Sequence, residues 1–473
     1  MRSFFLLVIL LLLYLPGFFT LPPIDRDEAR FAQSSKQMVE SGDYVDIRIQ
    51  DVPRYKKPIG AYWLQALSAK TTGVVDKIWS YRVPSLLAAI LSVLALFWFG
   101  IGIIGGRGAF ISALLFGSSL LLIFEAHMAK TDALLLLSVV AAQCSLFTIY
   151  VKRDSNRYLS TLFWVAQGFG ILIKGPITPI ISFLTIITLL VIDKYKREEM
   201  VWLRYLRFPF GIAIVLIMVL PWLVVITRVS DGDFIRESLG RDFFSKAFST
   251  QESHGFFPGY YLLLFPVTFF PGTLYLFSRL RLFWRNRGRR EVCFALAWIV
   301  PSWILFEFMP TKLPHYVLPL YPAIALLIGA FSESINLRRL YYCVAVIIIS
   351  VFIALEVIAP RLPGLWISRE VAGIVNEYRG DRFVSIASVG YHEPSLVFQL
   401  GRDTALLDNW HVRNFISMNR ESIVIINNTD AGPLLNYAAM KSIKMEKLGE
   451  VAGVNYSKGK WLELDIYVVS NLN

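Results

Sequence analysis

The long polar segment after the first apolar run, residues 22–80, contains ionisable side chains at spacings that suit a group-transfer reaction. Asp27 and Arg30 lie three residues apart in a helical pattern that runs to Gly42, so they share one helix face. A carboxylate there can act as a general base or orient a hydroxyl group, and a guanidinium can pair with phosphate. The other explanation is that Asp27 and Glu28 only offset the dipole of the first helical turn.

A pair of lysines follows in the same segment. Lys57 directly precedes Pro58, which restricts its backbone, and its ammonium group suits phosphate binding as a point charge. A solvated basic turn that includes Lys56 explains these residue types equally well. The choice depends on the elements around the segment.

Those elements are predicted to be membrane helices. Hydrophobic residues make up 55% of the 473 residues and charged residues 17%, whereas soluble domains contain about 25% charged residues. The three cysteines lie inside apolar runs, which predicts buried thiols rather than disulfides. The first apolar run is not followed by the small-residue cleavage site of a signal peptide, so we expect an uncleaved helix.

Eleven apolar runs have the length of a membrane span and are bounded by charged residues, Pro or Gly. They are 3–21, 81–104, 109–126, 132–151, 159–173, 175–192, 208–228, 259–278, 292–309, 315–331 and 340–359.

Basic residues mark one side of the predicted membrane. They cluster in alternate loops, near residues 152–157, 194–207, 279–290 and 338–339, and short basic loops stay in the cytoplasm. Topology and attraction to anionic lipid headgroups therefore explain much of the net charge of +12, and nucleic-acid binding is not needed. The opposite loops are predicted to face the periplasm: 22–80, 127–131, the Lys174-Gly175-Pro176 break, 229–258, 310–314 and the tail.

The chain therefore divides into a membrane part, residues 1–359, and a tail, residues 360–473. Short β-rich runs alternate with helical patterns in the tail, which indicates a small α/β domain in the periplasm. The predicted strands are 383–389, 423–427 and 462–470, and the helical patterns lie near 394–400 and 431–441.

Several short motifs occur in order between about residues 20 and 335. They are Asp27-Glu28-x-Arg30-Phe31, Ser41-Gly42-Asp43, Lys57-Pro58 with Tyr62-Trp63, Lys130-Thr131-Asp132, Lys174-Gly175-Pro176, His254 with Pro258 and Tyr260-Tyr261, and Lys312-Leu313-Pro314-His315-Tyr316 with Pro319 and Tyr321-Pro322. This ordered set resembles the bacterial 4-amino-4-deoxy-L-arabinose lipid A transferases, the ArnT-like proteins, which belong with the protein O-mannosyltransferases to the GT-C glycosyltransferases.

The resemblance implies roles for matching residues. Asp27 matches the essential loop acid proposed to be catalytic, Glu28 belongs to the same motif, and Asp132 resembles a second acid at the cavity mouth. The groups that would hold the carrier phosphate are Arg30, Lys57 and Lys174, with Tyr316 as a nearby aromatic. An inverting transfer needs a base on the acceptor hydroxyl and positive charge on the departing polyprenyl phosphate.

The sequence departs from the family pattern at two positions. Members often have an acid directly before the Lys-Pro pair, where this chain has Lys56, and that acid and a later His resemble metal ligands. His254 matches the His without its acidic partner, so no metal or other cofactor is assigned, and binding of a divalent metal stays open. Phe31 stands where Tyr is common. Further candidates for the cavity are Lys56, His254, Lys312, His315 and Arg241; His315 also suits a capped helix end and Arg241 a solvated helix face.

We therefore expect a polytopic α-helical membrane protein of GT-C type, with a large first periplasmic loop and a small C-terminal α/β periplasmic domain. It would be a monomer in the bacterial inner membrane. It would move a sugar from a polyprenyl-phosphate donor to lipid A, core oligosaccharide or another envelope acceptor, on the periplasmic face. The alternatives are a protein O-mannosyltransferase-like enzyme with a Ser or Thr acceptor, and a secondary transporter, which would place charges in the middle of spans.

Overall fold

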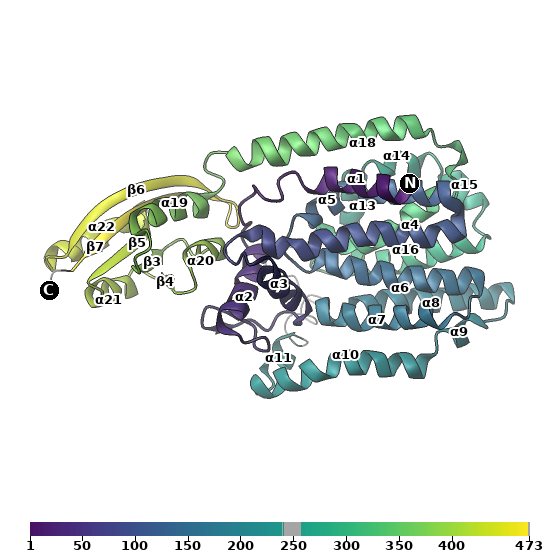
Figure 1. Cartoon of the computed structure of the whole chain (residues 1–473), viewed down its shortest axis with the longest axis horizontal. Helices are drawn as coiled ribbons and strands as arrows, with labels where there is room; N and C mark the ends of the chain where they lie inside the picture. The colour runs from purple at the N-terminus through teal and green to yellow at the C-terminus, as the bar shows by residue number, and fades with distance from the viewer. Residues whose placement is uncertain (239, 241–256, 472–473) are drawn as a thin grey trace.

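The computed structural model describes residues 1–238, 240 and 257–471. Figure 1 shows an elongated molecule with a body of long, roughly parallel helices at one end and a twisted sheet at the other. The helices of the body and of the segments that join them are α1 (Arg2–Tyr14), α2 (Asp27–Ser41), α3 (Gly60–Thr72), α4 (Ile78–Gly117), α5 (Leu120–Ala126), α6 (Asp132–Lys152), α7 (Arg157–Lys174), α8 (Ile177–Lys196), α9 (Trp202–Tyr205), α10 (Phe208–Val229), α11 (Asp233–Ile235), α13 (Tyr260–Thr268), α14 (Gly272–Phe277), α15 (Leu280–Arg285), α16 (Arg290–Phe308), η2 (Pro314–Leu320), α17 (Tyr321–Gly329), η3 (Ser332–Ser334), α18 (Leu337–Phe352), η4 (Ile353–Ile358) and η5 (Ala359–Arg361).

Six helices of the described chain are long and apolar enough to cross a bilayer. They are Ile78–Gly117, Asp132–Lys152, Ile177–Lys196, Trp202–Val229, Arg290–Phe308 and Leu337–Arg361, with Arg2–Tyr14 and Pro314–Gly329 as shorter apolar helices. The chain is thus a multi-pass membrane protein. The predicted runs 81–104 and 109–126 are confirmed as separate helical segments, because α4 is interrupted at Gly105, whose φ of 77° and ψ of 160° are not helical. The chain turns back there: the rings of Phe97 and Phe110 lie 6.4 Å apart, one on each side of the break. The second run is itself divided into the end of α4 and the short helix α5. The count of eleven spans stays a prediction.

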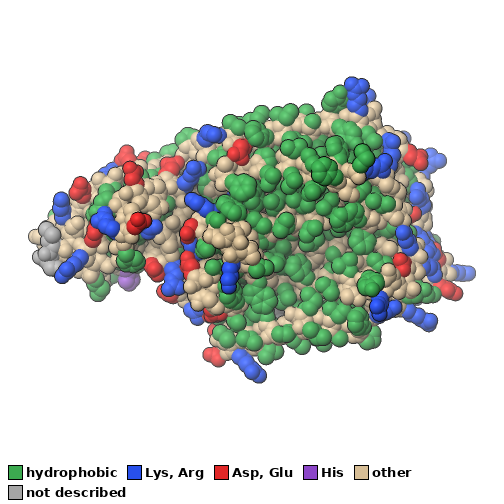
Figure 2. All heavy atoms as spheres, in the orientation of Figure 1, with side chains coloured by type: hydrophobic (Ala, Val, Ile, Leu, Met, Phe, Trp, Pro, Cys, Tyr) green, Lys and Arg blue, Asp and Glu red, His purple; other side chains and the backbone are tan. Residues whose placement is uncertain are grey.

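Figure 2 shows where the polar surface lies on this body. Hydrophobic side chains cover the middle of the visible helical face, and charged side chains gather over its two ends. The loops around α9 and α15, which contain two of the basic clusters, lie at the end opposite the sheet. An apolar belt between two polar ends is the surface that a bilayer requires.

Helix α4 lies inside the body and packs on α6, α17 and α1. A Cβ atom at Gly108 would lie 2.5 Å from the carbonyl oxygen of Gly329 on α17, so this crossing requires glycine. Close by, the Ser112 hydroxyl donates to the Ala325 carbonyl at 2.8 Å. Small residues at a helix crossing allow the backbones to approach, which is the usual basis of helix packing within a membrane.

The predicted first loop folds into α2, a small hairpin of β1 (Arg48–Ile49) and β2 (Val52–Pro53), and α3. Helix α2 begins at Asp27, directly after Arg26 in a left-handed conformation (φ 67°). It ends at Gly42, whose φ of 75° is the left-handed geometry that commonly terminates helices. The helical pattern expected up to Gly42 is therefore present in the structure.

The C-terminal part is a five-stranded sheet with helices on both faces. Its elements are α19 (Ile367–Arg379), β3 (Ser385–Val389), α20 (Pro394–Leu400), β4 (Ala405–Leu407), α21 (His411–Met418), β5 (Glu421–Asn427), α22 (Asn428–Met440), β6 (Lys444–Asn455) and β7 (Lys460–Ser470). The strand order is β4-β3-β5-β7-β6, with β4, β3 and β5 parallel and β7 antiparallel to both neighbours.

Side chains of β5 alternate between the two faces of this sheet, as the strand period demands. Ile423 and Ile425 pack in a cluster with α19 and α20, whereas Val424 and Ile426 pack in a second cluster with α21 and α22. The predicted alternation of strands and helices is thus a three-layer arrangement. Treating residues 360–473 as a domain of their own stays a proposal.

Candidate active site

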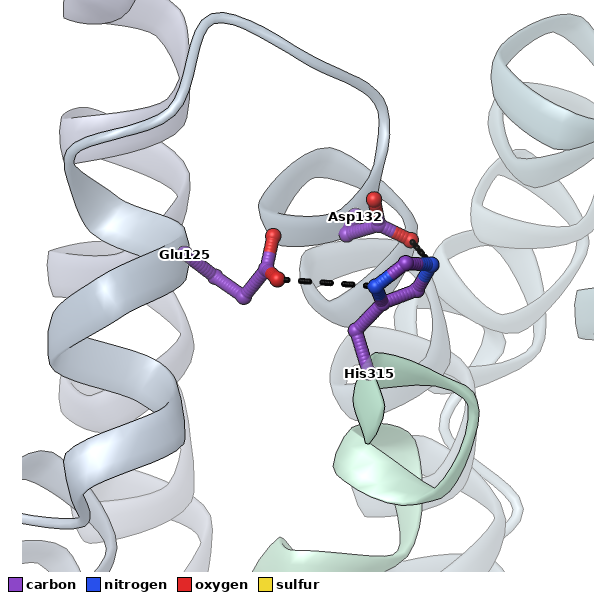
Figure 3. Close-up of side chains that lie close together, drawn as sticks. All are labelled: Glu125, Asp132 and His315. Atoms are coloured by element: carbon purple, nitrogen blue, oxygen red, sulfur yellow. Dashed lines mark ion pairs between the residues drawn. The ribbon is translucent and has the colours of Figure 1, made fainter. Parts of the chain in front are cut away.

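A compact group of charged side chains gathers where four segments of the body meet. The acids are Glu125 at the end of α5 and Asp132 at the start of α6, and the cations are Lys130 and Lys174. Lys130 Nζ lies 2.9 Å from Glu125 Oε1 and 3.5 Å from Asp132 Oδ2, and Lys174 Nζ lies 2.5 Å from Asp132 Oδ1. The imidazole of His315 lies between the two carboxylates, as Figure 3 shows. We call these five residues the charged cluster.

Local sequence explains why these side chains meet. Asp132 lies in the first turn of α6, where the helix dipole favours an acid, and Lys174 lies in the last turn of α7, where it favours a cation. Gly175, with φ 72°, ends α7 directly after this lysine, and Pro176 precedes α8. The Lys174-Gly175-Pro176 break expected from the sequence therefore brings an ammonium group to the end of a helix hairpin.

Three members of the charged cluster have donor atoms that could bind a metal ion: Glu125, Asp132 and His315 offer ligand atoms within 4.8 Å of one another. One oxygen of Glu125 also lacks a hydrogen-bond partner in the described structure. However, two ammonium groups already neutralise the two carboxylates, so a divalent cation would add two uncompensated positive charges to a buried site. These residues do not fit a resident divalent metal.

Asp27 lies beside the charged cluster with its carboxylate open to solvent. Its side chain is 56% exposed, and the guanidinium of Arg54 lies 4.0 Å away. Burial lowers the pKa of Lys130, but the carboxylates of Glu125, Asp132 and Asp27 outweigh this effect and raise that pKa above its usual value. Asp27 is thus near enough to act electrostatically on the cluster, with an oxygen free for a ligand.

The expected phosphate-binding residues are distributed around the same site. Lys174 Nζ lies 5.4 Å from the centre of the Tyr316 ring, a cation–π distance. Arg30 follows Asp27 by one turn of α2 and is half-buried, as is Lys57 at the entry to α3. The structure thus brings Lys174 and Tyr316 together. Arg54, which the sequence did not single out, lies 5.6 Å from the Phe31 ring.

Glu28 has a different environment from its neighbour Asp27. Glu28 and Arg82 of α4 are both 0% exposed and form a two-pronged ion pair, with distances of 2.8 and 2.9 Å. Glu28 also accepts hydrogen bonds from the amides of Ile24 and Ala129. All its strong interactions are with protein, so this geometry favours an anchor and not an acid that meets substrate. Arg82 was missed, although an arginine inside an apolar run is a signal in itself.

Two of the remaining candidates, Lys56 and Lys312, do not belong to the charged cluster. Lys56 is exposed, and Lys312 is buried with its ammonium group donating to the Met309 carbonyl at 2.7 Å. His254 and Arg241 lie outside the described residues. Glu125 and Lys130, in contrast, belong to the cluster although sequence reasoning assigned them no role. The available signal was that Lys130 begins the Lys130-Thr131-Asp132 motif and that Glu125 shortly precedes it.

Comparison with known proteins identifies relatives of this arrangement. A family profile described as dolichyl-phosphate-mannose-protein mannosyltransferase matches residues 56–225. The undecaprenyl phosphate-alpha-4-amino-4-deoxy-L-arabinose arabinosyl transferase of Edwardsiella ictaluri is 26% identical over 344 residues, which are 71% of this chain and 60% of the relative. The protein of the same name from Yersinia pestis is 25% identical over 66% of this chain and 57% of its own. The chain thus spans about three fifths of the length of these curated relatives.

Solved structures show the same fold. ArnT from Cupriavidus metallidurans bound to undecaprenyl phosphate matches with a TM-score of 0.77 at 16% identity, over 98% of this chain and 97% of that one. The archaeal oligosaccharyltransferase AglB from Archaeoglobus fulgidus matches with a TM-score of 0.52 at 11% identity, over 93% and 70%. The resemblance found in the motifs is confirmed by these matches, and so is the GT-C type of fold.

Proposed function

We propose, from the premise that the chain is an ArnT-like member of the GT-C glycosyltransferases, that it transfers a sugar from a polyprenyl-phosphate donor to an envelope glycolipid such as lipid A. The observation that carries this proposal is the exposed carboxylate of Asp27 beside the charged cluster. A general base and anchored cations at one site are what this transfer requires. We place the enzyme in the bacterial inner membrane, as a monomer.

The reaction follows from these groups. Asp27 takes the proton of the acceptor hydroxyl, the hydroxyl oxygen forms a bond to the anomeric carbon of the sugar, and the bond from that carbon to the carrier phosphate breaks. The leaving polyprenyl phosphate takes the electron pair and gains a negative charge. Lys174, held by Asp132, stabilises this charge together with Arg30 and Lys57. Tyr316 limits the position of Lys174 through its ring.

The orientation in the membrane follows from charge. The basic loops around α9 and α15 lie at the end opposite the C-terminal sheet, and short basic loops stay in the cytoplasm. The site, the first loop and the sheet would then face the periplasm. The donor is also amphiphilic, and its chain can remain in the bilayer while its phosphate meets the cations at the polar boundary.

Mass spectrometry of lipid A and core oligosaccharide from strains with and without the gene tests this function. We expect a species heavier by one sugar residue only when the gene is present. The family profile over residues 56–225 favours a second candidate, transfer to a Ser or Thr hydroxyl of a protein. Mass spectrometry of secreted proteins from the same strains separates the two: a change in glycopeptides with unchanged lipids would replace the first candidate with the second.

The neighbouring lysines provide a matched test of donor binding. Lys57→Ala is expected to raise the KM for the donor by about 10- to 100-fold, because a hydrogen bond to a charged group contributes about 1.5–3 kcal/mol. Lys56→Ala, which changes an exposed side chain of the same charge, is expected to change the KM by less than about threefold. Assays with purified donor in detergent measure both. Equal effects of the two changes would remove Lys57 from the donor site.

A further inference from the structure

The C-terminal sheet contacts the chain directly before Asp27. The turn between β6 and β7 reaches residues 25 and 26: the amide of Asp25 donates to the Tyr456 hydroxyl at 2.8 Å, and the guanidinium of Arg26 donates to the carbonyl oxygen of Ser457. The amide of Ser395, at the start of α20, donates to Asp25 Oδ1 at 3.2 Å. Two separate segments of the C-terminal part therefore form hydrogen bonds with two consecutive residues of the first loop.

Hydrogen bonds within the C-terminal part connect the two segments that contact Asp25 and Arg26. Glu393 Oε1 accepts from the Asn455 amide group at 2.8 Å and from the Ser457 hydroxyl at 2.5 Å. Asn455 Oδ1 in turn accepts from the backbone amides of Ser457 and Lys458 at 3.1 and 3.2 Å. These bonds fix the β6–β7 turn to the residue that precedes α20. The turn is a rigid support rather than a loose loop end.

A second set of contacts holds the far side of the first loop. Lys36 of α2 donates to the Phe398 carbonyl at 3.3 Å and lies 5.3 Å from its ring. The side-chain amide of Gln50 donates to the carbonyls of Arg402 and Thr404 at 2.8 and 2.7 Å. The C-terminal part thus contacts the residues directly before α2, Lys36 within α2, and the small hairpin that follows.

The backbone of Arg26 has an energetically unfavourable conformation. Arg26 has φ 67° and ψ −115°, a conformation that residues with a side chain rarely adopt and that costs about 1–3 kcal/mol where it occurs. Such a conformation persists only when its surroundings impose it. Arg26 immediately precedes Asp27, so the backbone conformation of Arg26 sets the direction in which the Asp27 side chain points from the start of α2.

We infer that the C-terminal part positions the catalytic acid: Tyr456, Ser457 and Ser395 hold Asp25 and Arg26, and thereby set the place of Asp27 at the mouth of the charged cluster. This inference rests on the proposed function and gives the C-terminal sheet a role in it. Tyr456, Asp25 and Arg26 are positioning residues, since none of their described contacts is with the charged cluster. Displacing a reacting group by about 1 Å can cost a factor of about 100 in rate.

Tyr456→Phe is the sharpest probe, because it removes only the hydroxyl that accepts from the Asp25 amide. We expect kcat to fall about tenfold with the donor KM within about twofold of the wild type, since the cations stay in place. Arg26→Gly keeps the left-handed backbone accessible but removes the contact with Ser457, and we expect the same pattern. The matched control is Lys444→Ala, an exposed change at the start of β6 that should leave both constants unchanged.

A double variant separates positioning from general structure. If Tyr456 acts through Asp27, adding Tyr456→Phe to Asp27→Asn should cause no further loss beyond the single Asp27→Asn variant. A further tenfold loss in the double variant, or full activity of Tyr456→Phe, would overturn the positioning role. Full activity of Asp27→Asn would instead overturn the proposed function itself, so the two failures are distinguishable.

The contacts between Asp25 and the C-terminal part should also make the stability of the protein depend on pH. Burial, with the nearby Glu393 carboxylate, raises the pKa of Asp25 from 3.8 to about 6 against the hydrogen bonds of Ser395 and Tyr456; Tyr391 also faces it. Because the folded pKa lies above the unfolded one, the folded chain binds the proton more tightly, and this contribution to stability falls as the pH rises from about 4 to 6. Asp25→Asn should therefore gain thermal stability over the wild type as the pH rises through this window. Parallel thermal midpoints would show that Asp25 is not buried against the C-terminal part.

Discussion

Asp27→Asn is expected to lower kcat for sugar transfer by at least about 100-fold, the usual contribution of a positioned general base. Asparagine has nearly the same shape but cannot take the proton of the acceptor hydroxyl. The side chain is 56% exposed and its ion pair with Arg54 is long, at 4.0 Å, so the variant should fold and melt like the wild type. Single-turnover assays with donor and acceptor in detergent measure the rate directly.

The control for this variant is Asp51→Asn, which changes another exposed acid in the same loop. We expect its rate to be unchanged. The KM for the donor in Asp27→Asn should stay within about threefold of the wild type, because the carboxylate acts on the acceptor side. A variant that transfers sugar at more than about a tenth of the wild-type rate would require another base.

The adjacent residue is expected to affect folding, and with a large magnitude. Glu28→Ala would leave the guanidinium of Arg82 buried without a counter-charge, which costs about 3–5 kcal/mol. It would also remove the acceptor for the amides of Ile24 and Ala129. We expect a strongly lowered thermal midpoint and a poor yield of monodisperse protein, measured by fluorescence-detected size exclusion on heated samples.

The comparison with Asp27→Asn decides how Glu28 acts. Glutamine has nearly the size of glutamate and keeps one of its two acceptor oxygens. Glu28→Gln should therefore be less destabilised than Glu28→Ala. Its remaining activity per folded molecule should stay near that of the wild type. A Glu28→Gln protein that melts normally but does not transfer sugar would return Glu28 to the catalytic residues.

Much of the membrane part was predictable because its signals are local. Asp132–Lys152 and Phe208–Val229 agree with the predicted runs within one residue at each end, since charged residues bound a long apolar stretch. Helix α2, Asp27–Ser41, agrees with the predicted helical pattern that contains Asp27 and runs to Gly42. The sheet was harder: β6 is a charged edge strand with a bulge near Lys447, and its sequence has little of the alternation that reveals a half-buried strand.

The residues of the candidate site also fall into two groups, those predictable from local motifs and those that only tertiary packing brings together. Asp132, Lys174, His315 and Tyr316 belong to motifs that precede or follow helix ends, and the structure brings them within reach of one another. The partners of Glu28 could not be predicted, because Arg82 is 54 residues away and only tertiary packing joins the two. The same holds for the hydrogen bond between Asp25 and Tyr456, which depends on a strand turn near the other end of the sequence.

The hydrogen bond between Asp25 and Tyr456 can form only after most of the chain has been synthesised. The residues joined by the bond between Asp25 and Tyr456 are 431 positions apart. At about 5–20 residues per second, the ribosome makes the second partner roughly 20–90 seconds after the first. During that interval α2 can reach the lipid boundary, but the turn that holds its first residues does not yet exist. A nascent chain stalled before residue 456 would therefore lack the hydrogen bonds that hold Asp25 and Arg26.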